Sequence, residues 1–288
     1  MPENYKKHGL FFLVLILLFL TLLFFYLDWR NSHRGFTFAM LDVGQGDGLF
    51  IESPTGTQVL VDSGPPKKLL GKLVGMMPFF DRSIDILIIT NPDTDHIGSF
   101  VDIVKNYKIG MVVEPGTYNE SKTYQNLKQQ ITDKNIPVVL AQAGMEIDLG
   151  GGARMEILFP DRDVSLWDTN DGSMIARVWY GETSIMLTGD ASSQTEKIIL
   201  QKYGAEYLDS DILKVGHHGS RTSSSYSFVD AVSPEYAFIS NGKDNKYGHP
   251  HIDTLETLAY FGAKILRTDL LGTIILSCDR IETCKINK

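Results

Sequence analysis

The sequence predicts an α+β fold in which two β-sheets pack face to face and helices cover both outer faces, an αββα sandwich of four layers. Short runs rich in Val, Ile and Leu recur along most of the chain, and such runs are typical of buried strands. Helix-like stretches separate these runs in both halves of the chain, which places helices outside two sheets. A long apolar segment precedes the domain and stands apart from this pattern.

The apolar segment at residues 10–27 has the features of a membrane anchor. It carries no charge, and Thr21 is its one weakly polar residue. Eighteen residues of helix rise about 27 Å, which is close to the hydrocarbon thickness of a bilayer. A cleaved signal peptide is the competing interpretation, but its apolar run would be shorter and a small-residue cleavage site would follow. We therefore predict a single transmembrane helix at 10–27 after a short tail at 1–9.

The charges beside the segment bear on its orientation. Lys6 and Lys7 precede it, and Arg30 and Arg34 follow it, so the positive-inside rule nearly ties. A short N-terminus with two lysines resembles a signal anchor, which predicts an extracytoplasmic domain. A linker at 28–35 then leads to one domain at 36–288.

The elements of that domain are predicted from its apolar periodicity. Strands are expected at residues 36–41, 49–52, 58–61, 84–89, 108–113, 138–140, 146–149, 154–158, 173–180, 183–187, 211–215, 236–240, 264–266 and 273–277. Helices are expected at residues 67–76, 97–107, 122–133, 192–203 and 253–261. A doubly wound α/β fold is the alternative, and it needs a glycine-rich loop between the first strand and a helix. The glycine-rich residues 44–48 lead into another strand instead.

Composition bounds the function classes. The 288 residues carry a net charge of −8, with 43% hydrophobic and 22% charged residues, as expected for one large domain. This balance excludes a generally basic nucleic-acid binder, although a bound metal can neutralise a phosphate locally. The two cysteines, Cys278 and Cys284, lack the C-x-x-C spacing of a thiolate zinc site. They either bridge a hairpin in an oxidising compartment or remain two free thiols.

Polar residues with metal-binding side chains cluster behind the predicted strand at 84–89. The sequence N-P-D-T-D-H places Asn91, Asp93, Asp95 and His96 within six residues. Ordinary turn and helix-cap chemistry explains one aspartate at such a place, but it does not explain the histidine. Loops at strand ends are a common location for chemistry in folds of this kind.

Other predicted strands end in the same way. Asp190 follows the strand at 183–187, and the pair at 217–218 follows the strand at 211–215. A fourth loop carries His249 and His251, so five of the seven histidines fall in these loops. This grouping predicts a metal site. Lys214 lies within the strand before the pair, so its charge is expected to be paired internally.

The chain resembles the metallo-β-lactamase superfamily and, more narrowly, the hydrolase domain of the ComEC-type DNA-uptake (competence) proteins. The resemblance covers residues 35–277 and implies the four-layer metallo-β-lactamase sandwich. Its motifs are M-L-D-V-G-Q-G-D (40–47), V-L-V-D-S-G (59–64), T-N-P-D-T-D-H-I-G-S (90–99), N-D-G-S (170–173), L-T-G-D-A (187–191), L-K-V-G-H-H-G-S-R-T-S (213–223), Y-G-H-P (247–250) and R-T-D-L-L-G-T-I (267–274).

The resemblance implies metal ligands in the positions of the family's H-x-H-x-D-H motif. These positions hold Asn91, Asp93, Asp95 and His96 here, and the asparagine departs from the pattern. We expect Asp93, Asp95 and His96 to bind metal, with Asn91 as a further metal or supporting residue. Asp62, in V-D-S-G, is expected to buttress the metal loop.

The remaining implied ligands lie in the second half of the chain. Asp190 matches the aspartate that bridges two metals. His217 or His218 matches the last ligand, and we favour His217 because it is the first of the two. The superfamily's middle histidine is missing, and Asp171 stands near its place as a further candidate.

These residues imply a metal-dependent phosphodiesterase or nuclease that acts on DNA through a metal-activated hydroxide. Asp95 and His249 are the expected catalytic residues, and His249, Ser220 and Thr222 are expected to contact the substrate. One or two divalent ions are expected, Mn²⁺ or Zn²⁺, and the oxygen-rich second half-site favours Mn²⁺. A DNA-uptake channel is the partner that the resemblance implies.

Two alternatives remain at this point. The first is another hydrolase of the same fold, acting on an ester, a thioester or a β-lactam. The second is a catalytically impaired nucleic-acid-binding module, for which Asn91 and the missing histidine are the motivation.

Overall fold

The computed structural model describes residues 3–32, 34–78, 80–279 and 284–287. Two sheets form its centre, with strand orders β15-β14-β1-β2-β3-β4-β5-β6 and β13-β12-β11-β10-β9-β8-β7. The first sheet contains β1 (Phe36–Met40), β2 (Leu49–Glu52), β3 (Gln58–Val61), β4 (Ser83–Ile88), β5 (Lys108–Glu114), β6 (Val138–Leu140), β14 (Ile274–Cys278) and β15 (Cys284–Asn287). The second contains β7 (Glu146–Gly150), β8 (Ala153–Phe159), β9 (Ile175–Tyr180), β10 (Thr183–Leu187), β11 (Ile212–Lys214), β12 (Tyr236–Ile239) and β13 (Lys264–Arg267).

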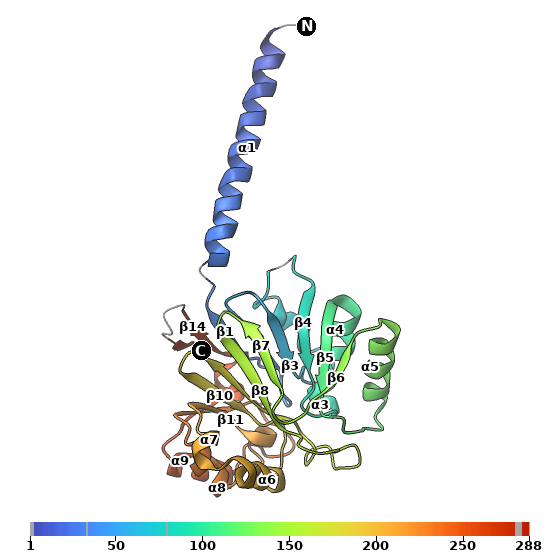
Figure 1. The fold of residues 1–288 in the computed structure, drawn as a ribbon, viewed down its shortest axis with the longest axis vertical. Coiled ribbons are helices and arrows are strands. Elements are labelled where there is room, and N and C mark those ends of the chain that lie inside the picture. Colours follow the sequence, from blue (N-terminus) through green and yellow to red (C-terminus); the bar gives the residue numbers. More distant parts are fainter. Residues whose placement is uncertain (1–2, 33, 79, 280–283, 288) are drawn as a thin grey trace.

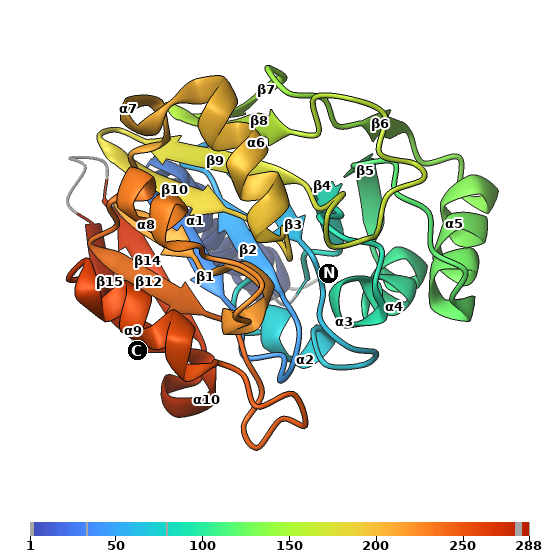
Figure 2. The ribbon, with the colours of Figure 1, turned by 90° about the horizontal axis from the view of Figure 1, so that it is seen from below.

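Helices cover the outer faces of both sheets, so the predicted four-layer fold is confirmed (Figure 2). The first sheet carries α2 (Leu70–Leu73), α3 (Thr94–Ile97), α4 (Phe100–Asn106) and α5 (Lys122–Asp133). The second sheet is accompanied by α6 (Ser193–Tyr203), α7 (Ala205–Leu208), the 3₁₀ turn η1 (Gly216–Gly219), α8 (Tyr226–Val232), α9 (Ile252–Tyr260) and α10 (Thr268–Leu271).

The alternating direction of side chains along each strand explains the layers. Phe38 of β1 points between the sheets and packs in one core with Met155 and Val178 of the second sheet. Its neighbour Ala39 points the other way, into a core shared with Phe100 of α4. Because successive side chains of a strand face opposite sides, each strand contributes to the central core and to one outer core.

The N-terminal helix α1 (Glu3–Ser32) stands apart from the domain (Figure 1). Its window His8–Phe25 is long and apolar enough to cross a membrane, and none of it is buried in the protein. The helix continues through residues 28–32, which we expected in the linker. The span therefore lies in a helix that projects from the sandwich into its surroundings.

Two expected helices are shorter than their patterns indicated. The stretch at 67–76 forms only α2: Lys67 has a left-handed backbone with φ 67°, which cannot belong to the helix, and Gly75 weakens its continuation beyond Leu73. The stretch at 97–107 divides into α3 and α4 at Gly98. A Cβ atom at this glycine would lie 2.5 Å from the Pro66 ring, so the close approach of another loop requires glycine. The N–H of the next residue, Ser99, donates to the backbone oxygen of Gly64 at 3.2 Å instead of continuing the helix.

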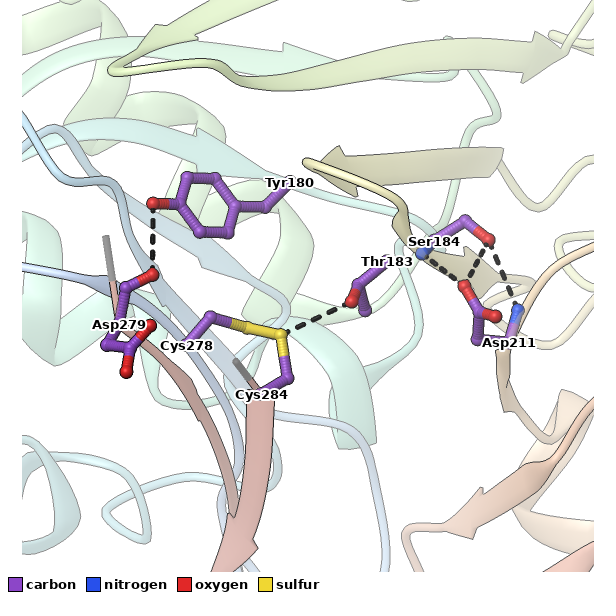
Figure 3. The surroundings of a disulfide bond; sticks show 7 residues. All are labelled: Tyr180, Thr183, Ser184, Asp211, Cys278, Asp279 and Cys284. Carbon is purple, nitrogen blue, oxygen red and sulfur yellow. Dashed lines mark hydrogen bonds between the residues drawn. A yellow bond between two sulfur atoms is a disulfide. The ribbon is translucent and has the colours of Figure 1, made fainter. Parts of the chain in front are cut away.

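The two cysteines form a disulfide between β14 and β15 (Figure 3). Cys278 and Cys284 are also opposite one another in the antiparallel register of these strands. The Cys284 sulfur lies 3.2 Å from the Thr183 hydroxyl, and the Tyr180 hydroxyl donates to the backbone oxygen of Asp279 at 3.4 Å. Of the two interpretations left open by the sequence, the structure therefore has the bridged hairpin.

The register of β1 against β14 gives the domain a polarity. Cys278 lies opposite Phe36, where the chain arrives from α1, and Ile274 lies opposite Met40. The loop at 41–48, which follows Met40, is thus about 13 Å along the strand from the disulfide. The anchor and the disulfide lie at one end of the sandwich, and the loops described next lie at the other.

Candidate metal centre

Five loops build the site, and each follows the end of a strand. The loops after β1 and β3 carry Asp47 and Asp62, and the loop after β4 carries residues 91–96. Asp190 follows β10, and residues 217–218 follow β11. Strands β3 and β4 are parallel, as are β10 and β11. Parallel strands end at the same edge of a sheet, so the two sheets bring these loops together.

His96 is buried between two carboxylates. Its Nδ1 lies 2.8 Å from Asp62 Oδ2, and its Nε2 lies 3.1 Å from Asp190 Oδ2. The other oxygen of Asp62 accepts from the backbone N–H of Thr90 at 2.8 Å, and the Thr90 hydroxyl donates to the Asp62 carboxylate as well. Asp62 therefore holds the ring of His96 and the start of the metal loop, in the place where we expected a buttress.

His218 is held in a comparable way. Its Nδ1 lies 3.0 Å from the backbone oxygen of Ser240 and 3.3 Å from Asp47 Oδ1. Its Nε2 lies 3.5 Å from Asp190 Oδ2 and 3.6 Å from Asp95 Oδ2. A histidine that binds metal through one ring nitrogen commonly donates from the other to an oxygen of the protein. His218 has this arrangement.

His217, which we favoured as the ligand, lies farther from the centre. Its Nε2 is 3.7 Å from Asp190 Oδ2, and its side chain is 25% exposed. Its Nδ1 lies 3.2 Å from the hydroxyl of Thr222, which in turn lies 3.0 Å from the hydroxyl of Ser220. Both of the expected substrate-binding hydroxyls are thus engaged in placing this histidine.

The backbone at the two histidines is unusual. His217 and His218 both have left-handed conformations, with φ of 48° and 56°, and Asp62 has φ 56°. Such a conformation costs a residue other than glycine of order 1 kcal/mol or more, and it clusters at functional sites. The double left-handed turn directs two adjacent histidines toward the same cavity.

The central atoms have the spacing of ligands around one cation. Ligands about 2.1 Å from a tetrahedral ion stand about 3.4 Å apart. The separations around Asp190 Oδ2 are 3.1 Å to His96 Nε2 and 3.5 Å to His218 Nε2. Asp95, His96 and His218 form one group of candidate ligands, and Asp190 and His218 belong to another with Asp47.

Unsatisfied polar atoms support the same fit. The Nε2 atoms of His96 and His218 and the Oδ1 atom of Asp190 are buried and form no hydrogen bond with the residues that the structure describes. An unpaired buried polar atom is costly, and a bound cation would satisfy these atoms. Two imidazole nitrogens and two carboxylates suit Zn²⁺ or Mn²⁺. The residues present therefore fit a divalent metal.

The charges in the cluster shift one another's pKa. Burial lowers the pKa of His218, but the carboxylates of Asp190 and Asp47 outweigh it and raise the pKa to about 9. For His96, burial likewise opposes Asp190 and Asp62, which raise its pKa well above the usual value. Burial raises the pKa of Asp190, but His218 and His96 hold it well below its usual value. Without metal, the raised pKa values of His96 and His218 therefore favour the protonated form of these two rings.

Asp93 and Asn91 lie beside this cluster in a separate hydrogen-bond network. Asp93 Oδ1 accepts from Asn119 Nδ2 at 2.6 Å, and Asp93 Oδ2 accepts from the Thr169 hydroxyl at 3.0 Å. Asn91 Oδ1 accepts from the backbone N–H of Asp93, and Asn91 Nδ2 donates to Asn170 Oδ1 at 2.9 Å. A second ion at this half-site would have to displace hydrogen bonds that are already made.

Asp171 points away from the candidate ligands. Its carboxylate accepts from the hydroxyl of Ser192, the N-cap of α6, and its backbone oxygen accepts from the Thr195 hydroxyl at 2.6 Å. The neighbouring Asn170, rather than Asp171, faces the site through Asn91.

A cavity of about 210 Å³ opens above the cluster. Its lining contains Asp93, Asp95, Asp190, His217, His218, Asn170, Gln45, Tyr247 and His249. His249 lies at the rim, with its Nδ1 3.5 Å from Gln45 Nε2. Burial, together with His218 and His217, lowers the pKa of His249 to about 4, so this ring is neutral near pH 7. It can donate a hydrogen bond to a substrate oxygen as a neutral group.

Two side chains at the site, Asp47 and Asn119, were not assigned from the sequence. Asp47 lies in the motif at 40–47, and its place between the two sheets emerges only from the fold. Gly46 allows the Asp47 loop to pack against the metal loop, because a Cβ atom at this glycine would lie 2.1 Å from the Asp95 backbone oxygen. Asn119 comes from a distant loop with no motif. Lys214 was expected to be paired, and its ion pair with Asp47 confirms this.

Comparison with known proteins decides the family. The profile of the Metallo-beta-lactamase superfamily matches residues 41–243, which is well over half of the chain. The chain belongs to the metallo-β-lactamase superfamily. The crystal structure of CmlA, a diiron β-hydroxylase from Streptomyces venezuelae, has a TM-score of 0.55 at 17% identity and covers 85% of this chain and 54% of that one. The metallo-β-lactamase-fold protein YhfI of Bacillus subtilis has a TM-score of 0.53 at 15% identity, with coverages of 80% and 96%. At these identities the two structures support the fold alone.

Curated relatives confirm the narrower resemblance. ComE operon protein 3 of Bacillus subtilis is 29% identical over 253 residues, covering 82% of this chain and 32% of the relative. Competence protein ComA of Neisseria gonorrhoeae is 31% identical over 238 residues, with coverages of 81% and 31%. The chain thus spans about a third of the length of these relatives. It is a protein of the metallo-β-lactamase superfamily that is related to competence proteins.

Proposed function

We propose that this protein is a metal-dependent phosphodiesterase, a nuclease that acts on DNA. The observation that carries the proposal is a set of buried atoms of His96, His218 and Asp190 that form no hydrogen bond with any described residue, beside an open polar cavity lined by His218 and Asp190. The similarity to competence proteins supports DNA as the substrate, because DNA handling is the activity implied for that group.

The proposed ligands of the principal metal are Asp95, His96, Asp190 and His218. A divalent ion held there supplies positive charge for a phosphate and lowers the pKa of a bound water to near neutrality. Asp62 keeps the ring of His96 in place. Without the ion, carboxylates line this cavity and repel a phosphodiester, so substrate binding itself depends on the metal.

Residues at the rim of the cavity are positioned for the substrate. His217 is partly exposed and lines the cavity, with its Nε2 3.7 Å from Asp190 Oδ2. We assign His217 and His249 to contacts with phosphate oxygens, and the neutral ring of His249 stabilises the leaving oxygen by donating a hydrogen bond. Ser220 and Thr222 act through His217, which they orient.

A second, weaker ion is proposed around Asp93. Its oxygens already accept from Asn119 and Thr169, and Asn91 is fully engaged. Binding there therefore competes with internal hydrogen bonds, whereas the Nε2 atoms of His96 and His218 form no hydrogen bond within the described part of the chain. The proposed centre has two unequal sites, and its oxygen-rich half prefers Mn²⁺.

We further propose that residues 10–27 anchor the protein in a membrane, with the domain at 36–288 outside the cytoplasm. The disulfide supports this orientation, because such bonds persist in oxidising compartments. The metal site lies at the end of β1 opposite the anchor, so it faces away from the membrane. An open site at that end suits capture of extracellular DNA beside an uptake channel.

A turnover screen tests the function. The purified full chain would be assayed with Mn²⁺ and with Zn²⁺ on single-stranded DNA, bis-p-nitrophenyl phosphate and nitrocefin, with Asp190→Asn as the inactive control. We expect metal-dependent cleavage of the two phosphodiesters. Turnover of nitrocefin alone would favour the ester, thioester or β-lactam alternative. Metal-dependent retention of DNA without cleavage would favour the catalytically impaired binding module.

A further inference from the structure

A buried ion pair beneath the metal centre has no role in the chemistry proposed above. Lys214 and Asp47 are each 1% exposed, and the Lys214 ammonium contacts Asp47 Oδ2. Removing two charges from water costs several kcal/mol per ion, and an apolar pair of similar volume is often at least as stable. Such a pair therefore needs an explanation beyond stability.

The carboxylate of Asp47 leads directly to a proposed ligand. Its Oδ1 lies 3.3 Å from His218 Nδ1, and the backbone oxygen of Ser240 lies 3.0 Å from the same nitrogen. Both neighbours of Nδ1 are acceptors, so this nitrogen carries the proton. When the ring is neutral, as metal binding requires, the lone pair is then on Nε2, which faces Asp95 and Asp190.

The ammonium of Lys214 has a second partner. It donates to the backbone oxygen of Gly189 at 2.9 Å, directly before Asp190. One buried cation therefore connects two segments at the proposed metal centre. The first is the loop of Asp47, which supports the ligand His218, and the second is the turn that carries the ligand Asp190. His96 has a simpler support, because Asp62 reaches its Nδ1 at 2.8 Å.

We infer that Lys214 and Asp47 form a positioning pair for the metal centre. The Asp47 carboxylate beside Nδ1, together with the hydrogen bond from Nδ1 to the Ser240 backbone oxygen, favours the His218 tautomer with its proton on Nδ1. Lys214 fixes the Asp47 carboxylate and places the Asp190 turn. The inference rests on the metal centre of the proposed function. It adds a role for two residues that do not touch the metal or the substrate.

The direction in which Lys214→Met changes the metal affinity distinguishes a positioning role of Lys214 from a direct effect of its charge. An ammonium repels a divalent cation. If Lys214 acted on the metal through its charge alone, it would weaken metal binding, and Lys214→Met would therefore tighten it. Positioning predicts the opposite: Lys214→Met lowers the affinity for Mn²⁺ by about 10- to 100-fold, as is usual when a group that supports a metal ligand is lost. The measurement is Mn²⁺ titration of the full-length protein followed by electron paramagnetic resonance, with no activity readout.

Lys128→Met is the matched control. Lys128 pairs with Glu114 away from the cavity, so its loss removes an ion pair and leaves the Mn²⁺ affinity unchanged. The double variant Lys214→Met with Asp47→Leu removes the unpaired charge that could prevent folding of the single variant. We expect it to fold and to keep the low affinity.

Nuclear magnetic resonance of the unmutated protein, loaded with Zn²⁺ and carrying ¹⁵N-labelled histidine, provides a test that depends on no variant. We expect the His218 ring to carry its proton on Nδ1 and to bind Zn²⁺ through Nε2. A proton on Nε2, or an unchanged or tighter Mn²⁺ affinity in Lys214→Met, would overturn the inference alone. Absence of metal binding by the unmutated protein would overturn the proposed function as well.

Discussion

Exchanging the two adjacent histidines for alanine, one at a time, tests which of them holds the metal. His218 Nε2 lies 3.5 Å from Asp190 Oδ2 and 3.6 Å from Asp95 Oδ2, within the spacing of ligands around one ion. Losing a ligand costs at least the roughly 100-fold that marks the upper range for loss of a supporting group, or about 3 kcal/mol. His218→Ala should therefore weaken Mn²⁺ binding by 100-fold or more.

His217→Ala should behave differently. This side chain is partly exposed and lies 3.7 Å from Asp190 Oδ2, so its loss should change the Mn²⁺ affinity by less than about 1 kcal/mol, the size of one hydrogen bond. It should instead reduce kcat/KM for DNA by about tenfold, through loss of a substrate contact. Isothermal titration with Mn²⁺ gives the affinities, and cleavage of labelled DNA gives kcat/KM. Loss of metal binding in His217→Ala with retention in His218→Ala would refute this assignment.

Three further predictions follow from the same geometry. The raised pKa of His218, about 9, stabilises the metal-free protein below pH 6.5 by about 3 kcal/mol, and this is lost as the pH rises through 9. Since the neutral ring binds metal, the rise in Tm on adding Mn²⁺ should grow between pH 6.5 and 9; a shift that shrinks would count against it. Asn119→Ala frees an oxygen of Asp93 and should strengthen the weaker of two Mn²⁺ binding steps, and equal, tight binding of two Zn²⁺ per chain would contradict unequal sites. Reducing the disulfide should lower the free energy of unfolding in urea by about 2 kcal/mol and leave DNA cleavage unchanged, because the bond lies at the far end of β1; loss of cleavage in the folded, reduced protein would contradict this polarity.

The sequence predicted the layers and most of the side chains that meet at the candidate site, because both follow from strand periodicity. Asp95 and His96 follow directly after β4, and Asp190 closely follows β10, so naming the strands located the residues. Asp62 was recognised in the same way. These are local relations between a strand and its own end, and they need no knowledge of which loops meet.

Contacts between distant segments could not be predicted in this way. The choice between His217 and His218 depends on two consecutive left-handed residues, which no periodicity reveals. Asn119 reaches Asp93 across 26 residues from a loop without a motif. Asp47 meets Lys214 only when the two sheets pack, so the pair is a property of the sandwich rather than of either half.

Anomalous diffraction from crystals soaked in Mn²⁺ would test the metal centre most directly. We predict one strong peak bounded by Asp95, His96, Asp190 and His218, and a weaker peak beside Asp93. A strong peak that His218 does not contact, or a principal peak among other residues, would contradict the proposed centre.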